Sequence, residues 1–173
     1  MNPVFVGYRC CGKTTLAMAL AKELGMDWFD TDAGVENVLG TSIQEWVAAH
    51  GWDAFRRTES QVLAEALAMP GTVVATGGGI VMDGGNRNQI LQNGIGIWLQ
   101  ADLATILSRL NPVEDARRPR LTREQSLEEE TRQMLELRNP LYESVAKISL
   151  DTGGITVENA VEYIKGRLDH GRF

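Results

Sequence analysis

Residues 7–14, Gly-Tyr-Arg-Cys-Cys-Gly-Lys-Thr, constrain the fold of this chain more than any other stretch. They match the phosphate-loop pattern G-x-x-x-x-G-K-[ST]. The apolar run Val4–Val6 precedes the pattern and predicts a buried strand, and Thr14–Leu24 follows it with apolar residues at helical spacing. A strand, a glycine-bounded loop and a helix in this order direct backbone N–H groups and the positive end of a helix dipole at one point. The segment therefore predicts a binding site for a nucleoside triphosphate, and the agreement of both flanks disfavours a chance glycine-rich turn.

The same pattern assigns roles to individual side chains. Lys13 is expected to reach the β- and γ-phosphates, and the Thr14 hydroxyl is expected to bind Mg²⁺. ATP and Mg²⁺ are therefore the predicted cofactors. Other residues of the loop and of the helix that follows are expected to contact the nucleotide through backbone or side chain: Gly7, Cys10, Cys11, Gly12 and Thr15.

Length and composition limit the class of protein. The 173 residues fit a single domain spanning 1–173, and the net charge of −6 argues against a general nucleic-acid-binding protein. No apolar run is long enough to span a membrane. Cys10 and Cys11 are the only cysteines and are adjacent, which predicts reduced thiols in a cytoplasmic protein and neither a zinc site nor a disulfide framework. We expect a monomer that binds small molecules.

Strand and helix patterns alternate along the chain. Further strands are predicted at Trp28–Phe29, Thr72–Thr76, Ile95–Leu99 and Ile148–Leu150, and helices at 35–69 (interrupted near Gly40 and Gly51), Asp102–Leu110 and Val157–Leu168. This alternation predicts an α/β fold of the P-loop NTPase type, with a five-stranded parallel sheet flanked by helices on both faces. Ligands are expected at the carboxyl ends of the strands.

Two carboxylates follow the second predicted strand, as Asp30-Thr31-Asp32. Carboxylates one residue apart can divide the work, so that Asp30 faces Mg²⁺ and Asp32 faces an acceptor hydroxyl. The alternative is that Asp32 only caps the next helix, since aspartate is a favoured N-cap residue.

Three consecutive glycines, Gly77, Gly78 and Gly79, follow the third predicted strand. Glycine loses more backbone entropy on folding than other residues, so three in a row indicate a compensating requirement. That requirement is either positive φ angles or a close approach of the backbone to a ligand, and a plain flexible loop is the alternative. The strand does not end in the Asp-Glu pair that is typical of motor and unwinding ATPases, which disfavours that class.

Arginines are placed to bind anions. Arg56 and Glu59 are three residues apart on a predicted helix, so their pairing could orient the guanidinium for a carboxylate; an ordinary surface pair is the alternative. The segment 116–123 holds four arginines between two predicted helices. We interpret it as a mobile lid over about 112–124 that closes over phosphates, in preference to a solvated charged face.

Taken together, these residues resemble the shikimate kinase family over nearly the whole chain. The matching motifs are residues 7–15, Asp30-x-Asp32, Phe55-Arg56-x-x-Glu59, Thr76–Gly79, Arg118-Pro119 and Arg138–Tyr142. The resemblance implies transfer of the ATP γ-phosphoryl group to the 3-hydroxyl of shikimate, a step of aromatic amino acid biosynthesis, with substrate-binding helices at about 33–69. It implies the following roles: Asp32 as the base, Asp30 in the magnesium shell, Arg56 and Arg138 on the carboxylate, Gly77, Gly78 and Gly79 at the ring, Arg118 as the lid arginine, and Arg109 and Thr152 near the adenine.

The chain also departs from the family pattern. Cys10 occupies a place where the family usually has glycine, so it must accept the backbone angles of the loop. The segment at Thr152 lacks the arginine often found near the adenine. Two alternatives stay open on the residues alone: a related small-molecule kinase such as a gluconate kinase, and a catalytically inactive nucleotide-binding regulatory module.

Two other groups of residues receive a structural interpretation. Trp28, Trp46, Trp52 and Trp98 lie in or beside apolar patterns and are expected in the core. The acidic run Glu128–Glu130 is expected to form a solvated helix face.

Overall fold

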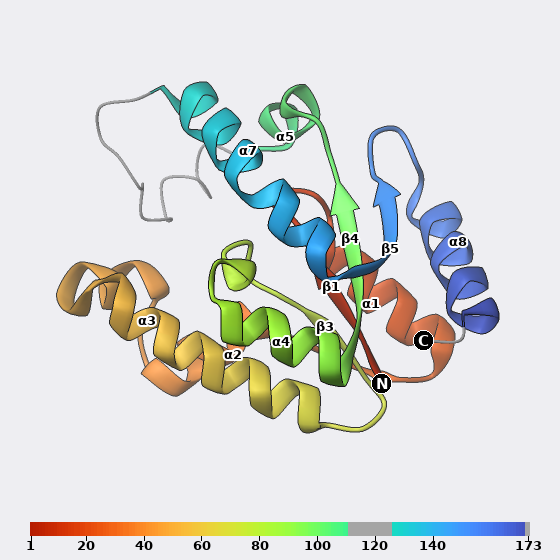
Figure 1. Ribbon diagram of the computed structural model, residues 1–173, viewed down its shortest axis with the longest axis horizontal. Helices are drawn as coiled ribbons and strands as arrows, with labels where there is room; N and C mark the ends of the chain where they lie inside the picture. Colours follow the sequence, from red (N-terminus) through yellow and green to blue (C-terminus); the bar gives the residue numbers. More distant parts are fainter. Residues whose placement is uncertain (111–125, 172–173) are drawn as a thin grey trace.

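The computed structural model describes residues 1–110 and 126–171, and within them it confirms the predicted α/β architecture (Figure 1). All strand pairs are parallel, and the sheet has the order β2-β3-β1-β4-β5. The strands are β1 (Asn2–Val6), β2 (Asp27–Asp30), β3 (Thr72–Ala75), β4 (Gly94–Gln100) and β5 (Ala146–Asp151). Because β1 is the central strand, the loop that follows it lies between the carboxyl ends of β3 and β4.

Helices connect the strands and cover the sheet. They are α1 (Lys13–Leu24), α2 (Thr31–Leu39), α3 (Ile43–Ala68), the 3₁₀ helix η1 (Ile80–Met82), α4 (Gly84–Asn93), α5 (Leu103–Arg109), α7 (Leu127–Val145) and α8 (Val157–His170). The expected interruptions are confirmed: Gly40 ends α2 with φ 67°, and Gly51 (φ 80°, ψ 170°) kinks α3. Helix α4 was not predicted, because few of its residues are apolar; Asp83 caps it by accepting a hydrogen bond from the Asn86 N–H at 2.9 Å.

Successive side chains of β1 point to opposite faces of the sheet, so the hydrophobic core has two layers. The Phe5 side chain packs with α1 and α8 on one face of the sheet, and Val4 and Val6 pack with α3, η1, α4 and α7 on the other. Figure 1 shows this division, with α1 and α8 side by side. A smaller apolar cluster, centred on Val35 and Phe55, joins α2 to α3 and fixes the helices expected to bind the acceptor.

Two interpretations of exposed and buried residues were wrong. Trp28 is 43% exposed, because β2 is the edge strand and one of its faces is not covered. Glu130 is buried and only Glu128 and Glu129 are exposed. Successive helix residues are rotated by about 100°, so three in a row do not share one face, and Glu130 turns inward with Thr131.

Hydrogen bonds link the ends of neighbouring strands next to the motifs. The Thr76 hydroxyl donates to the carbonyl of Phe5 at 2.8 Å, which links the end of β3 to β1. The Thr152 N–H donates to the carbonyl of Gln100 at 2.8 Å, which links the end of β5 to β4. The phosphate loop, the glycine run 77–79 and Thr152 therefore lie along one edge of the sheet. In the part of the chain that is described, no helix is both long and apolar enough to cross a bilayer.

Candidate active site

The phosphate loop connects β1 to α1, as the sequence predicts. The N-cap of α1 is Gly12 (φ 95°), which makes no side-chain cap, and the first turn contains no acidic residue. The backbone N–H groups at this helix end are therefore available to an anion. The Lys13 ammonium donates to the carbonyls of Gly7 at 2.9 Å and of Tyr8 at 2.8 Å. The lysine thus spans the loop it belongs to, and its charge lies where phosphates would bind.

Cys10 adopts the left-handed conformation that glycine normally supplies. Its φ is 61°, and it is the only non-glycine residue with positive φ in the described part of the chain. A left-handed angle at a residue with a Cβ costs about 1–2 kcal/mol. Cys11 is fully buried, and its Sγ would lie 2.9 Å from a Cβ added at Gly7. The unusual loop sequence therefore keeps the loop conformation, with local strain at Cys10.

A cavity of about 380 Å³ opens beside the phosphate loop. It is lined by the loop and by the start of α8, and its walls contain the predicted nucleotide residues Cys10, Cys11, Gly12, Thr15, Arg109 and Thr152. The Arg109 guanidinium donates to the Thr152 hydroxyl at 3.1 Å, to the Thr152 carbonyl at 2.6 Å and to the Cys10 carbonyl at 3.4 Å. Arg109 thereby joins the end of β5 to the phosphate loop.

Asp30 connects the end of β2 to the loop. One carboxylate oxygen caps α2 by accepting from the N–H groups of Asp32 (2.9 Å) and Ala33 (3.4 Å). The other accepts a hydrogen bond from the Thr14 hydroxyl at 2.8 Å. The alternative interpretation of Asp32 as the helix cap is therefore wrong, because Asp30 performs that role. The two residues predicted to bind Mg²⁺, Thr14 and Asp30, are in direct contact.

Arg56 and Glu59 form an ion pair at the acceptor side. The Glu59 side chain is 1% exposed and the Arg56 side chain 25% exposed. Burial raises the pKa of Glu59 above its ordinary value, and the Arg56 charge opposes that rise. The guanidinium carbon also lies 5.4 Å from the ring centroid of Trp52 and 5.0 Å from that of Phe55. The carboxylate and the two rings hold the Arg56 guanidinium in one place. The alternative interpretation, an ordinary ion pair on the surface, is therefore excluded.

The glycine run fits between these charged groups. None of its members has positive φ. A Cβ added at Gly77 would lie less than 3.0 Å from an Asp32 carboxylate oxygen and 3.0 Å from a Glu59 carboxylate oxygen. A Cβ added at Gly79 would lie less than 3.0 Å from three atoms of the Arg56 guanidinium. The run is required because side chains approach its backbone closely, and this brings Asp32, Glu59 and Arg56 together.

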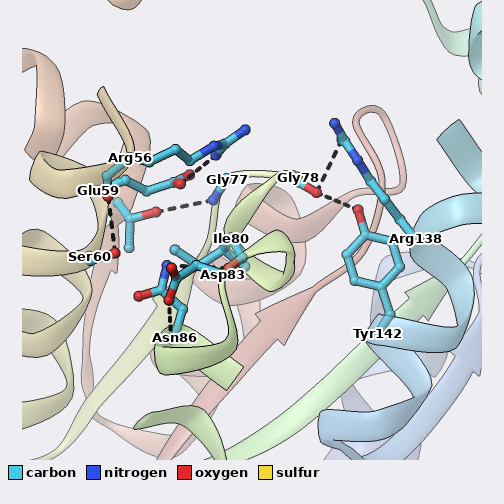
Figure 2. A network of polar contacts seen from close by, with 11 residues as sticks. Arg56, Glu59, Ser60, Gly77, Gly78, Ile80, Asp83, Asn86, Arg138 and Tyr142 are labelled. Atoms are coloured by element: carbon cyan, nitrogen blue, oxygen red, sulfur yellow. Dashed lines mark hydrogen bonds and ion pairs between the residues drawn. The ribbon is translucent and has the colours of Figure 1, made fainter. Parts of the chain in front are cut away.

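Arg138 approaches the glycine run from the opposite side. Figure 2 shows Arg56, from α3, and Arg138, from α7, reaching into the same space on either side of Gly77 and Gly78. Arg138 donates to the Gly78 carbonyl at 3.3 Å, and its guanidinium carbon lies 5.7 Å from the ring centroid of Tyr8 in the phosphate loop. Two guanidinium groups therefore face a small region next to the phosphate loop.

Comparison with known proteins identifies the family. A sequence profile described as "Shikimate kinase" matches residues 9–169. The chain is 44% identical over 147 residues to "Shikimate kinase 2" of Yersinia enterocolitica, which covers 84% of this chain and 83% of that protein. The chain belongs to the shikimate kinase family. The protein of the same name from Salmonella schwarzengrund is 41% identical over 153 residues, covering 87% of this chain and 83% of that protein.

Solved structures of shikimate kinases have the same fold. "Shikimate kinase from Acinetobacter baumannii in complex with shikimate" superposes with a TM-score of 0.91 at 30% identity, covering 99% of this chain and 94% of that chain. The shikimate kinase of Aquifex aeolicus gives a TM-score of 0.83 at 26% identity, covering 98% of this chain and 96% of that chain. As a member of the family the chain is an ATP-dependent kinase, a phosphotransferase.

The gluconate kinase alternative receives much weaker support. A gluconokinase from Sinorhizobium meliloti superposes with a TM-score of 0.58 at 14% identity, covering 97% of this chain and 91% of that chain. Identity this low shows a shared fold alone.

Two residues that contact the other members of the candidate site were not among the predicted site residues. Glu59 was expected only as a partner of Arg56, and its burial beside Asp32 could not be read from the helical spacing. Tyr142 was noted only as part of a family motif, yet its hydroxyl donates to the Gly78 carbonyl. The predicted lid at about 112–124, with Arg118, lies outside the described residues.

Replacing Gly79 with alanine tests the fit of the glycine run. The added methyl group would overlap the Arg56 guanidinium, which its pairing with Glu59 prevents from moving freely. Because a small misplacement of a binding group has a large effect, we expect the KM for shikimate to rise by roughly tenfold to a hundredfold. Steady-state kinetics measure this change. Gly166→Ala in α8 is the control, since no atom lies within 4 Å of its added Cβ; an equal rise in KM there would contradict the interpretation.

Proposed function

We propose that this chain transfers the γ-phosphoryl group of ATP to the 3-hydroxyl of shikimate and so forms shikimate 3-phosphate. The observation that carries the proposal is the pair of guanidinium groups, Arg56 and Arg138, on either side of the glycine run and beside the phosphate loop. Two planar cations suit the carboxylate of a small acid. Shikimate, a polyhydroxylated carboxylic acid, is the compound bound in the Acinetobacter baumannii relative.

Asp32 is the proposed base. Its carboxylate packs against Gly77, as does that of Glu59, and it does not serve as the cap of α2. In the reaction the 3-hydroxyl oxygen forms a bond to the γ-phosphorus, the bond to the β–γ bridging oxygen breaks, and ADP leaves. The hydroxyl proton passes to the Asp32 carboxylate.

Lys13 is the proposed contact for the β- and γ-phosphates. Its ammonium lies 2.9 Å and 2.8 Å from two carbonyls of the loop, so the charge is held in position before a nucleotide arrives. Phosphoryl transfer depends mainly on positioning and on neutralising charge, and a fixed ammonium contributes to both.

Thr14 and Asp30 are the residues that would hold Mg²⁺. Their side-chain oxygens lie 2.8 Å apart, and hydroxyl and carboxylate oxygens are the ligands that this ion prefers. Residues 1–110 and 126–171 contain no group of three or more histidine, cysteine or acidic side chains that could hold a metal. Mg²⁺ is usually bound by one or two protein groups together with substrate phosphates and water. When bound, the ion neutralises charge on the β- and γ-phosphates.

A single chain suffices for this chemistry. The phosphate loop, the nucleotide cavity, the two arginines and Asp32 all come from one copy, so we propose that a monomer is the active form. We also propose that it works in the cytoplasm, where ATP is available and where cysteines such as Cys10 and Cys11 stay reduced. Light scattering during gel filtration measures the mass, and an active dimer would contradict the first proposal.

ADP release by the purified protein tests the proposed function. We expect release with ATP, Mg²⁺ and shikimate together, and little release when shikimate is omitted or replaced with gluconate. Removal of Mg²⁺ with a chelator is expected to stop turnover. Folded protein that binds ATP but releases no ADP with shikimate would overturn the proposed acceptor, and release with gluconate would favour the other kinase class.

A further inference from the structure

Tyr142 is a buried hydrogen-bond donor beneath the acceptor side of the site. Its side chain is fully buried, and its ring centroid lies 6.3 Å from that of Trp98. Its hydroxyl donates to the Gly78 carbonyl (Figure 2). Burial raises the pKa of the Tyr142 phenol well above its ordinary value, so this group remains a neutral donor across the working pH range.

The Gly78 carbonyl accepts a second hydrogen bond from the same helix. Arg138 lies four residues before Tyr142 on α7, so the two side chains share one face of the helix. The Arg138 guanidinium donates to the Gly78 carbonyl at 3.3 Å. One backbone oxygen therefore connects Tyr142 to the guanidinium expected to bind the acceptor.

The helix itself is weakened between these two residues. Pro140 lies inside α7, between Arg138 and Tyr142, and it has no N–H to donate to the preceding turn. A helix segment that lacks a backbone hydrogen bond is held less firmly by its own helix. A contact outside the helix then has more influence on where Arg138 lies, and the bond from Tyr142 to Gly78 is such a contact.

Gly78 also packs against the phosphate loop. A Cβ added to it would lie 3.4 Å from the backbone nitrogen of Arg9 and 3.5 Å from the carbonyl oxygen of Gly7. The Gly78 carbonyl is thus held between α7 and the loop that binds the phosphates. Its position affects the distance between the acceptor carboxylate and the reacting phosphate.

We propose that Tyr142 is a positioning residue: its hydroxyl fixes the Gly78 carbonyl and, through it, the Arg138 guanidinium that receives the carboxylate of the acceptor. The proposal rests on the proposed function, because it takes shikimate as the acceptor. Tyr142 touches neither substrate, and its effect is exerted through Arg138. Binding of the acceptor anion should therefore depend on the hydroxyl of one fully buried side chain.

Tyr142→Phe removes that hydroxyl and keeps the buried ring. Losing one hydrogen bond that positions a binding group is expected to raise the KM for shikimate by about fivefold to tenfold, with kcat and the KM for ATP changed by less than about twofold. Circular dichroism and ATP binding verify the fold, and kinetics are measured below the Tm of the variant. Tyr163→Phe is the matched control, because Tyr163 is 44% exposed on α8.

An acceptor without the anion separates positioning from general loosening of the core. Shikimate methyl ester lacks the carboxylate charge, so Tyr142→Phe and the unmodified chain should show nearly the same KM for it. The proposal is overturned if the KM for shikimate is unchanged in the folded variant, or if the KM for shikimate and for its ester rise by the same factor. Absence of any turnover by the unmodified chain would instead refute the proposed function.

Discussion

Replacing Lys13 with alanine is expected to lower kcat by roughly 10²–10³-fold, the loss seen when one preorganised donor to a developing charge is removed. The ammonium lies at the start of α1 within the phosphate loop, where we propose that it contacts the terminal phosphates of the nucleotide. Turnover at saturating shikimate measures the effect. Near-normal turnover of the alanine variant would refute the role of Lys13.

The fold should survive this change. Helix α1 is anchored by buried apolar residues, including Leu16, Leu20 and Ala21, and among the described residues the Lys13 ammonium bonds only to its own loop. The circular dichroism spectrum of Lys13→Ala should therefore match that of the unmodified chain. Lys22→Ala is the control for charge, because Lys22 is an exposed lysine in the last turn of the same helix. Its turnover should be unchanged.

The phosphate loop could be predicted from the sequence because its groups are contiguous. A backbone cradle made by residues 7–14 depends on local angles and on the helix that follows, and both are encoded in one stretch of chain. The pairing of Arg56 with Glu59 was predictable for the same reason, since three residues of helix bring them together. Local spacing determines these contacts.

The glycine run depends on contacts between residues that are far apart in the sequence. The three glycines predicted either positive φ or a close approach of the backbone to a ligand; none of them has positive φ, and the close approach seen at Gly77 and Gly79 is that of the Asp32, Glu59 and Arg56 side chains. Those residues come from α2 and α3, and only the order of strands in the sheet brings them to Gly77 and Gly79. Long-range packing of this kind leaves no periodic signal in the sequence.

The two aspartates after β2 illustrate the same limit. Their spacing indicated a division of work, but capping by Asp32 remained open, because either residue could have preceded the first turn of α2. An N-cap at Asp32 would make Ala33 the first helical residue, but the helix begins at Thr31, two residues earlier, so Asp30 takes the cap. A shift of the helix start by two residues therefore decides which carboxylate caps the helix and which stays available, and sequence patterns do not place helix ends more accurately than that.

Arg56→Ala is expected to weaken shikimate binding and to destabilise the fold. The KM for shikimate should rise while ATP binding stays nearly intact, because the guanidinium faces the acceptor side of the glycine run. The substitution also leaves the Glu59 carboxylate buried without its cation. Breaking a buried pair in this way costs about 3 kcal/mol of unfolding free energy, the low end of the usual range because Arg56 is a quarter exposed. Arg57→Ala, an exposed neighbour on α3, is the control.

The loss of stability in Arg56→Ala should depend on pH. The pKa of Glu59 is raised in the folded protein above its ordinary value of 4.5, so this group contributes most to stability below that pH and less as pH rises through the folded pKa. Arg56 limits this loss of stability at higher pH, because its charge lowers the pKa of Glu59. The difference in unfolding free energy between the variant and the unmodified chain should therefore be small in acid and largest at neutral pH. A difference that is constant across this range would contradict the role of Glu59.

The double variant Arg56→Ala, Glu59→Gln separates the two effects of Arg56. Glutamine keeps the shape of Glu59 and removes the charge that the first substitution leaves unpaired, so the unfolding free energy at neutral pH should recover in part. The KM for shikimate should stay high, because no guanidinium remains on that side of the glycine run to receive the carboxylate. Recovery of both quantities would mean that Arg56 only neutralises Glu59, and the assignment of Arg56 to the acceptor would then be wrong.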